Sequence, residues 1–302
     1  MNLISKPTNF KVSPRKAKKR LGQHFLRDPG IISRIIDLAA PEPGATVLEI
    51  GPGEGVLTEA LLARGVNVVA VETDKDLWQP LAERFAAPAA AAANSEASPA
   101  TDAGPNFHLE HGDFLKVDLD ELFLQRLELS APVAVVANIP YQITTPILFR
   151  LIKYRHLFSS ATLMIQEEVA ARIMAAPGGR EYGRLTVGVG MNCEVDPGFK
   201  VHPGAFSPPP KVWSRVLRFE FLEQPRYKVE HQELFDRLLL ALFSQRRKQI
   251  INPLKGILTN LKRDEIYEKL MASGFVPEAR PATLTPEEMV RLADCISHWS
   301  KI

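Results

Sequence analysis

Residues 46–55 have the sequence TVLEIGPGEG, in which a short apolar run meets a turn that contains Gly51, Gly53 and Gly55. The apolar run predicts a buried strand over residues 46–50, and the residues after the turn predict a helix over 56–64. Glycines at a strand-to-helix turn let the backbone approach a ligand closely. Their spacing differs from the Gly-x-Gly-x-x-Gly of dinucleotide-binding turns, so it favours a nucleoside ligand without a pyrophosphate.

Strand-like and helix-like segments alternate from about residue 31 to residue 175. Such alternation predicts an α/β fold with a mostly parallel sheet that helices cover on both faces. Two later segments, residues 193–201 and 212–221, have no helix pattern between them and are candidates for an antiparallel hairpin at the sheet edge. The other predicted strands are 46–50, 66–71, 107–110, 133–137 and 161–165, and the predicted helices are 31–40, 56–64 and 77–85.

The chain of 302 residues is long enough for a larger domain followed by a smaller one. Residues 223–230 have the composition of a linker, and the pattern beyond them becomes helical over 234–243, 263–273 and 287–299. We therefore predict one domain over residues 1–223 and a small all-helical domain over 224–302. Residues 86–106 are rich in alanine and lack large apolar side chains, which predicts an exposed insertion in the first domain.

The composition limits the class of protein. A hydrophobic share of 45% and a charged share of 24% are typical of a globular protein. No apolar run approaches the ~20 residues of a membrane span, and the basic N-terminus has no apolar stretch of the secretory kind. The two cysteines, Cys193 and Cys295, are far apart and have no metal-ligand spacing. We expect a cytoplasmic protein with reduced thiols, no structural metal and no membrane partner.

The positive charge is concentrated, although the net charge is only +2. Residues 1–20 contain seven lysines and arginines and no acid, and the run ends with Lys18, Lys19 and Arg20. A second cluster consists of Arg246, Arg247 and Lys248. This distribution favours a polyanionic partner such as RNA. The alternative for the N-terminal run alone is a solvated charged tail.

Acidic residues follow two of the predicted strands. Glu72 ends the second strand, where a carboxylate can accept both ribose hydroxyls of an adenosine. Asp113 lies just after the third strand, where it can accept a hydrogen bond from the adenine amine of a cofactor. The alternative for Asp113 is a turn or helix-cap residue.

The tetrad of Asn138, Ile139, Pro140 and Tyr141 follows the predicted strand 133–137. The Asn138 side-chain carbonyl and the backbone carbonyl before Pro140 can accept the hydrogens of an exocyclic amine, and Tyr141 offers a flat face to a base. An ordinary Asn-x-Pro turn is the alternative. Phe206 begins a stiff segment with three consecutive prolines, which is able to hold that ring at the mouth of a site. The alternative for this segment is a proline-rich connector or a peptide-binding ligand.

Together with the segment of residues 18–26, which contains His24 and Leu26, these motifs resemble those of the bacterial small-subunit (16S) ribosomal RNA adenine dimethyltransferases, the KsgA family. The resemblance extends from Lys18 to at least Gly256. It implies a seven-stranded, Rossmann-like class I methyltransferase sheet and a C-terminal helical domain. Two features depart from the family pattern: His24 stands where some members have Asn, and the segment 86–106 is longer than expected.

The resemblance also implies the activity. Members transfer methyl groups from S-adenosylmethionine to the N6 amines of two adjacent adenosines near the 3′ end of the small-subunit RNA, late in the assembly of the 30S particle. Applied to this chain, it implies a monomeric enzyme that binds the immature particle through its two basic clusters. The catalytic residues would be Asn138, Pro140, Tyr141 and Phe206, and the cofactor would contact His24, Leu26, Gly51, Gly53, Glu72, Asp113 and Asn138.

Three other functions compete with this one. A large-subunit RNA adenine methyltransferase of the macrolide-resistance type shares most of the motifs. A DNA adenine methyltransferase would commonly have two prolines after the Asn, whereas this chain has only Pro140 there. A non-catalytic assembly factor on the same fold would not need Glu72, Asp113, Asn138 and Tyr141 together.

Overall fold

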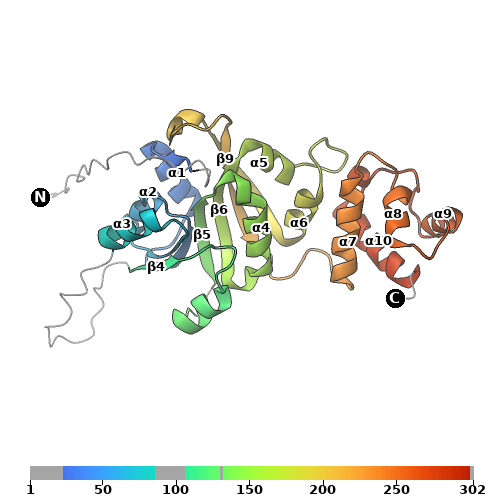
Figure 1. The fold of residues 1–302 in the computed structure, drawn as a ribbon, viewed down its shortest axis with the longest axis horizontal. Coiled ribbons are helices and arrows are strands. Elements are labelled where there is room, and N and C mark those ends of the chain that lie inside the picture. The colour runs from blue at the N-terminus through green and yellow to red at the C-terminus, as the bar shows by residue number, and fades with distance from the viewer. Residues whose placement is uncertain (1–22, 86–105, 130–131, 300–302) are drawn as a thin grey trace, which may run out of the picture.

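The structure is a computed structural model that describes residues 23–85, 106–129 and 132–299. Lys18, Lys19 and Arg20 lie outside the described residues, and so does nearly all of the predicted insertion. The described chain forms a sheet flanked by helices, with a group of C-terminal helices at one end of an elongated molecule (Figure 1).

The central sheet has seven strands in the order β4-β3-β2-β5-β6-β9-β7. The strands from β4 to β6 are parallel, whereas β9 runs antiparallel to both β6 and β7. The predicted class I methyltransferase sheet and its antiparallel edge hairpin are therefore confirmed. The strands are β2 (Thr46–Ile50), β3 (Asn67–Glu72), β4 (Phe107–His111), β5 (Val133–Asn138), β6 (Phe158–Gln166), β7 (Cys193–Val201) and β9 (Ser214–Phe221).

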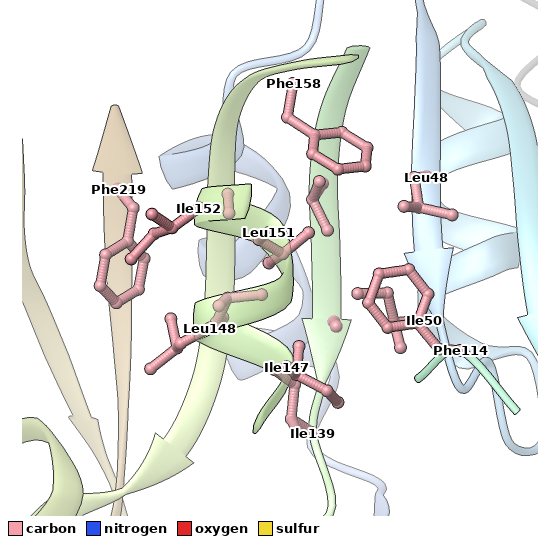
Figure 2. Close-up of a cluster of buried hydrophobic side chains, with 14 of the residues drawn as sticks. Leu48, Ile50, Phe114, Ile139, Ile147, Leu148, Leu151, Ile152, Phe158 and Phe219 are labelled. Carbon is pink, nitrogen blue, oxygen red and sulfur yellow. The ribbon is translucent and has the colours of Figure 1, made fainter. Parts of the chain in front are cut away.

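Helices cover both faces of the sheet. On one face lie α1 (Pro29–Ala39) and α2 (Val56–Ala63), whose buried side chains share a core cluster with β2, β3 and β9. On the other face lie α4 (Thr144–Lys153), α5 (Glu167–Ile173) and α6 (Arg184–Asn192). The helix α3 (Lys75–Phe85) lies beside β4. The side chains of Ile147, Leu148 and Leu151 lie on α4 among those of the neighbouring strands (Figure 2). Burial of this apolar face positions α4 directly after the tetrad at the end of β5.

A second, very small sheet was not predicted. It pairs β1 (Phe25–Leu26) with β8 (Phe206–Ser207) in antiparallel register, so that Leu26 is opposite Phe206. Two-residue strands have no sequence periodicity, which explains why no pattern indicated them. The pairing brings the N-terminal segment next to the proline-rich segment more than 180 residues later in the chain.

The C-terminal helices are α7 (Gln232–Ser244), α8 (Ile251–Ile257), α9 (Arg263–Ala272) and α10 (Pro286–Trp299), of which α8 was not predicted. The Thr285 hydroxyl accepts a hydrogen bond from the Glu288 N–H, and the Glu288 carboxylate accepts one from the Thr285 N–H, which together form a capping box. The apolar core of these helices also includes Tyr182 and Met191 from the preceding part of the chain. The Tyr182 hydroxyl donates a hydrogen bond to the Leu284 carbonyl at 2.9 Å, which joins the two parts.

We expect Leu151→Ala to lower the free energy of unfolding by about 2–5 kcal/mol, because its side chain is fully buried between α4 and the sheet. Leu240→Ala is the matched control, since Leu240 on α7 is 58% exposed, and it should change stability by less than about 0.5 kcal/mol. Chemical denaturation followed by circular dichroism measures both. Equal effects of the two substitutions would contradict the packing described for α4.

Candidate active site

A cavity of about 300 Å³ opens at the edge of the sheet where the parallel strands end. Open α/β sheets place their ligand sites at this edge, because the loops after the strand ends converge there. Residues from the ends of β2, β3, β4 and β5 line the cavity together with the N-terminal segment. The predicted site residues that line it are His24, Leu26, Gly51, Gly53, Glu72, Asp113, Asn138, Pro140 and Tyr141.

The glycine turn and Glu72 form one wall of the cavity. Gly51 and Gly53 have φ angles of +64° and +61°, which are strained for other residues. The Glu72 carboxylate accepts hydrogen bonds from the N–H of Gly53 at 3.1 Å and from the N–H of Asp74 at 2.7 Å. A carboxylate has about four acceptor positions, so two remain for hydroxyl groups of a ligand. Burial raises the pKa of Glu72, and the two backbone hydrogen bonds oppose that rise.

Glu49 also lines the cavity, and the sequence analysis did not select it. Its side chain is almost completely buried, and its Oε2 accepts a hydrogen bond from the Thr58 hydroxyl at 2.6 Å. Burial raises the pKa of Glu49 to about 8, which the Thr58 hydrogen bond only partly offsets. Its other oxygen, Oε1, is buried and has no hydrogen-bond partner among the described residues. An acid in the middle of an apolar strand pattern was the signal that could have identified it.

The cavity is acidic. Four of the residues that line it, Glu49, Glu54, Glu72 and Asp113, carry carboxyl groups, and no lysine or arginine lines it among the described residues. The Glu54 carboxylate is buried and forms an ion pair with Arg27 at 2.5 Å, which also attaches the N-terminal segment to the glycine turn. These acids, and the unsatisfied Oε1 of Glu49, fit a ligand with a positive charge and polar hydrogens, as the cationic S-adenosylmethionine has.

Asp113 lies in a turn and also lines the cavity. Its Oδ1 accepts a hydrogen bond from the Leu115 N–H at 3.0 Å, which closes the turn after β4. Its side chain is nevertheless 39% exposed and lines the cavity. The turn therefore holds the carboxylate in a fixed place at the cavity wall.

Asn138 ends β5, and its side-chain Nδ2 donates a hydrogen bond to the backbone carbonyl of His24 at 3.1 Å. A carbonyl oxygen can only accept, so this contact determines which end of the amide faces His24. Asn138 Oδ1 is then the end left for a ligand, and no hydrogen bond to it occurs within residues 23–85, 106–129 and 132–299. The contact at His24 uses the backbone, so it does not depend on whether that position is His or Asn.

Tyr141 is the last residue of the tetrad and is held on two sides. Its hydroxyl forms a 2.6 Å hydrogen bond with the Ser214 hydroxyl at the start of β9. Its ring lies near the His24 ring, with centroids 5.7 Å apart and planes inclined by 28°. The His24 Nδ1 is in turn 2.8 Å from the Pro208 carbonyl oxygen. Burial raises the pKa of Tyr141, so its phenol is protonated at neutral pH.

The structure does not place Phe206 at the mouth of the cavity, where the sequence analysis expected it. Phe206 is only 4% exposed and packs in the core with Leu26, its partner in the β1–β8 pairing. The pairing turns Phe206 inward and Ser207 outward, because successive residues of a strand point to opposite sides. Phe206 would have to leave this core to stack on a base, and in this structure the aromatic neighbour of Tyr141 is His24.

The basic residues at 246–248 lie between α7 and α8, away from the cavity lining. Arg246 donates hydrogen bonds to the backbone carbonyls of Gly179 and Arg180, so it connects the C-terminal helices to the loop before α6. Arg247 and Lys248 are exposed. A structural role for Arg246 was not predicted.

Comparison with known proteins identifies the family. The family described as ribosomal RNA adenine dimethylase matches residues 14–297. The chain belongs to this family. Its members include a ribosomal RNA small subunit methyltransferase A from Pseudomonas syringae, which is 38% identical over 93% of this chain and 95% of its own length. The protein of the same name from Clostridium botulinum is 40% identical over 93% of this chain and 94% of its own length. The predicted resemblance to the small-subunit dimethyltransferases is confirmed.

Solved structures agree with this membership of the dimethylase family. A dimethyladenosine transferase from Plasmodium falciparum has a TM-score of 0.67 and 27% identity, and the match covers 89% of this chain and 96% of that one. The 23S rRNA methyltransferase ErmE has a TM-score of 0.61 and 28% identity, over 90% of this chain and 98% of its own. Both support the class I methyltransferase fold.

No helix in the described ranges is long and apolar enough to cross a membrane. No group of three or more His, Cys, Asp or Glu side chains in the described part of the chain is arranged to hold a metal ion.

The raised pKa of Glu49 predicts a pH-dependent stability. The folded state retains a proton that the unfolded state loses above the usual glutamate pKa, so stability falls as pH rises toward about 8. We expect Glu49→Gln to remove this loss, by up to about 1.4 kcal/mol for each pH unit between pH 5 and pH 8. Denaturation curves across this range measure the effect, and Glu268→Gln, at an exposed position on α9, is the control. A constant difference between Glu49→Gln and wild type at all pH values would show that Glu49 is ionised throughout.

Proposed function

We propose that this chain transfers methyl groups from S-adenosylmethionine to the N6 amines of two adjacent adenosines near the 3′ end of small-subunit ribosomal RNA. The product is N6,N6-dimethyladenosine. One observation carries the proposal within this family: the Asn138 amide is oriented by the His24 carbonyl, which leaves its oxygen for an amine at an acid-lined cavity beside Tyr141.

The proposed cofactor site consists of His24, Leu26, Gly51, Gly53, Glu72, Asp113 and Asn138. When bound, S-adenosylmethionine supplies a methyl group activated by the positive charge of its sulfonium. Glu72 is the residue proposed to accept the two ribose hydroxyls, since its oxygens line the cavity beside the hydrogen bonds from Gly53 and Asp74. The Glu72 carboxylate adds a favourable field for the positive charge, whereas Glu54 is already paired with Arg27 and Glu49 retains its proton at neutral pH.

The protein residues position and polarise the target amine. The N6 lone pair is delocalised into the adenine ring, so an amine in this state is a poor nucleophile. We infer that the target base leaves its stack and rests on Tyr141, a contact worth roughly 1–3 kcal/mol. Asn138 Oδ1 and the Ile139 backbone carbonyl then accept the amine hydrogens and favour a tetrahedral nitrogen. Pro140 fixes the backbone between these acceptors and Tyr141.

The proton is released without a strong base. An amide oxygen orients an amine but accepts a proton poorly, so the proton passes to solvent after the methyl transfer. Tyr141 is also unsuited to accept it, because its phenol is protonated and its oxygen is occupied by the Ser214 hydroxyl. The site therefore accelerates the reaction chiefly by orientation, which contributes ~7–11 kcal/mol in favourable cases.

The proposed substrate is the RNA within an immature 30S particle. The exposed Arg247 and Lys248, together with Lys18, Lys19 and Arg20, would contact its phosphates, while Arg246 holds the adjoining loop in place. We propose that the enzyme acts as a monomer in the cytoplasm and needs no metal. A large-subunit RNA substrate is the competing function, and it is less favoured because the relatives at 38–40% identity are named for the small subunit.

The decisive experiment maps N6,N6-dimethyladenosine on small-subunit and large-subunit RNA in cells with and without this protein. The proposal expects two adjacent dimethylated adenosines in the small-subunit RNA that disappear with the protein. A single modified adenosine in large-subunit RNA would support the competing function instead.

We expect Asn138→Ala and Asn138→Asp both to lower methyl transfer by on the order of 10²- to 10³-fold. The first removes the acceptor for the amine. The second keeps an acceptor but places a carboxylate oxygen against the His24 carbonyl, which then has no donor. Methyl incorporation into under-methylated small subunits measures both variants. Near-normal activity of Asn138→Asp would mean that the contact with His24 does not matter for the site.

We expect Glu72→Gln to weaken cofactor binding by about 10- to 100-fold, because the amide replaces one acceptor oxygen with a donor. In the wild type, affinity should also fall as pH falls through the pKa of Glu72, which burial raises above the usual range. Calorimetry with S-adenosylhomocysteine at several pH values tests both expectations. The exposed Glu59→Gln is the control and should bind like the wild type. Unchanged binding by Glu72→Gln would remove Glu72 from the cofactor site.

A further inference from the structure

The proline loop, residues 208–213, carries two of the large exposed apolar side chains of the molecule. Val212 is 45% exposed and Trp213 is 51% exposed. Trp78 and Trp299, in contrast, are half-buried. Trp213 belongs to none of the apolar core clusters of the described chain, so packing does not explain an indole at this position.

Both ends of the proline loop contact residues of the proposed active site. At its start, the Pro208 carbonyl oxygen is 2.8 Å from His24 Nδ1, and the His24 ring lies near the ring of Tyr141. At its end, Ser214 forms the 2.6 Å hydrogen bond with the Tyr141 hydroxyl. The loop therefore passes beside Tyr141.

The sheet register gives the loop its place relative to the cavity. Ser214 is opposite Gln166, the last residue of β6, and Asn138 at the end of β5 is opposite Met164. Trp213 therefore lies just beyond the edge at which the parallel strands end and the cavity opens. The Trp213 carbonyl accepts the Glu167 N–H at 3.0 Å, which fixes the backbone at this position. The exposed indole is thus held by a rigid backbone.

Lys211 adds a positive charge two residues before Trp213. Its side chain is exposed and forms no ion pair with the described residues. An exposed aromatic ring with an unpaired cation close by, on a loop that prolines make stiff, has the chemistry of a surface that binds single-stranded nucleic acid. A protein partner would more usually meet an apolar patch with little charge at its centre.

We propose that Trp213 stacks on an unpaired nucleotide next to the target adenosine, with Lys211 against its phosphate. The inference rests on the proposed function and adds a second contact for the same RNA. Tyr141 holds the base that is being methylated, and Trp213 holds the neighbour that stays outside the cavity. The indole binds any base by its flat face, so it contributes to affinity and register more than to the choice of base.

The test compares Trp213→Ala, Trp213→Leu and Trp213→Phe in methyl transfer to under-methylated small subunits. We expect the KM for the particle to rise by about 5- to 150-fold in Trp213→Ala, the range that loss of one stacked base implies. Trp213→Phe should recover most of the affinity, whereas Trp213→Leu, which is apolar but not flat, should not. The kcat at saturating particle should stay within about threefold of the wild type, because the residue does not touch the reacting amine.

The matched control is Tyr267→Ala, which removes another exposed aromatic ring, 40% exposed on α9, and should leave KM unchanged. Calorimetry with S-adenosylhomocysteine should give wild-type affinity for every variant, which shows that the site is folded. A wild-type KM for Trp213→Ala, or equal recovery by Leu and Phe, would overturn the stacking proposal. Absence of small-subunit methylation by the wild type would refute the proposed function instead, so the two failures are distinguishable.

Discussion

The hydrogen bond from Asn138 Nδ2 to the His24 carbonyl is the contact on which the organisation of the site depends. It joins the end of the central strand β5 to the N-terminal segment, which crosses the edge of the sheet. It also separates the two ends of one amide, since the donor end contacts the polypeptide and the acceptor end lines the cavity without a hydrogen bond to the described residues. An amide is the only side chain of this size that offers both, which explains why a carboxylate would not serve at position 138.

The segment around His24 is held by a set of long-range contacts. β1 pairs with β8, the His24 ring contacts Pro208, and Arg27 forms an ion pair with the buried Glu54 of the glycine turn. These contacts join parts of the chain that are far apart in sequence, so closing the loops between them costs conformational entropy.

The central sheet was predictable, because parallel strands buried on both faces are continuous apolar runs and their helices are amphipathic. The carboxylate of Glu72 and the amide of Asn138 were predictable for the same reason, since each directly follows such a run. The position of Phe206 was not, because it depends on a two-residue strand whose partner is defined only in three dimensions. The structural role of Arg246 was not predictable for the same reason, since its hydrogen-bond partners are backbone carbonyls 66 and 67 residues away in the sequence.

The distribution of charge separates the two ligands that the reaction requires. Carboxyl groups such as those of Glu72 and Asp113 line the cavity, and no lysine or arginine of the described residues does, so the cavity favours a cationic cofactor over the phosphates of RNA. Only a single base that has left its stack can enter such a cavity without bringing its backbone along. Exposed cations such as Arg247 and Lys248 lie away from the cavity lining. Transfer of the methyl group removes the positive charge of the sulfonium, so the acidic wall that favours binding of the cofactor favours its product less, which helps the site to turn over.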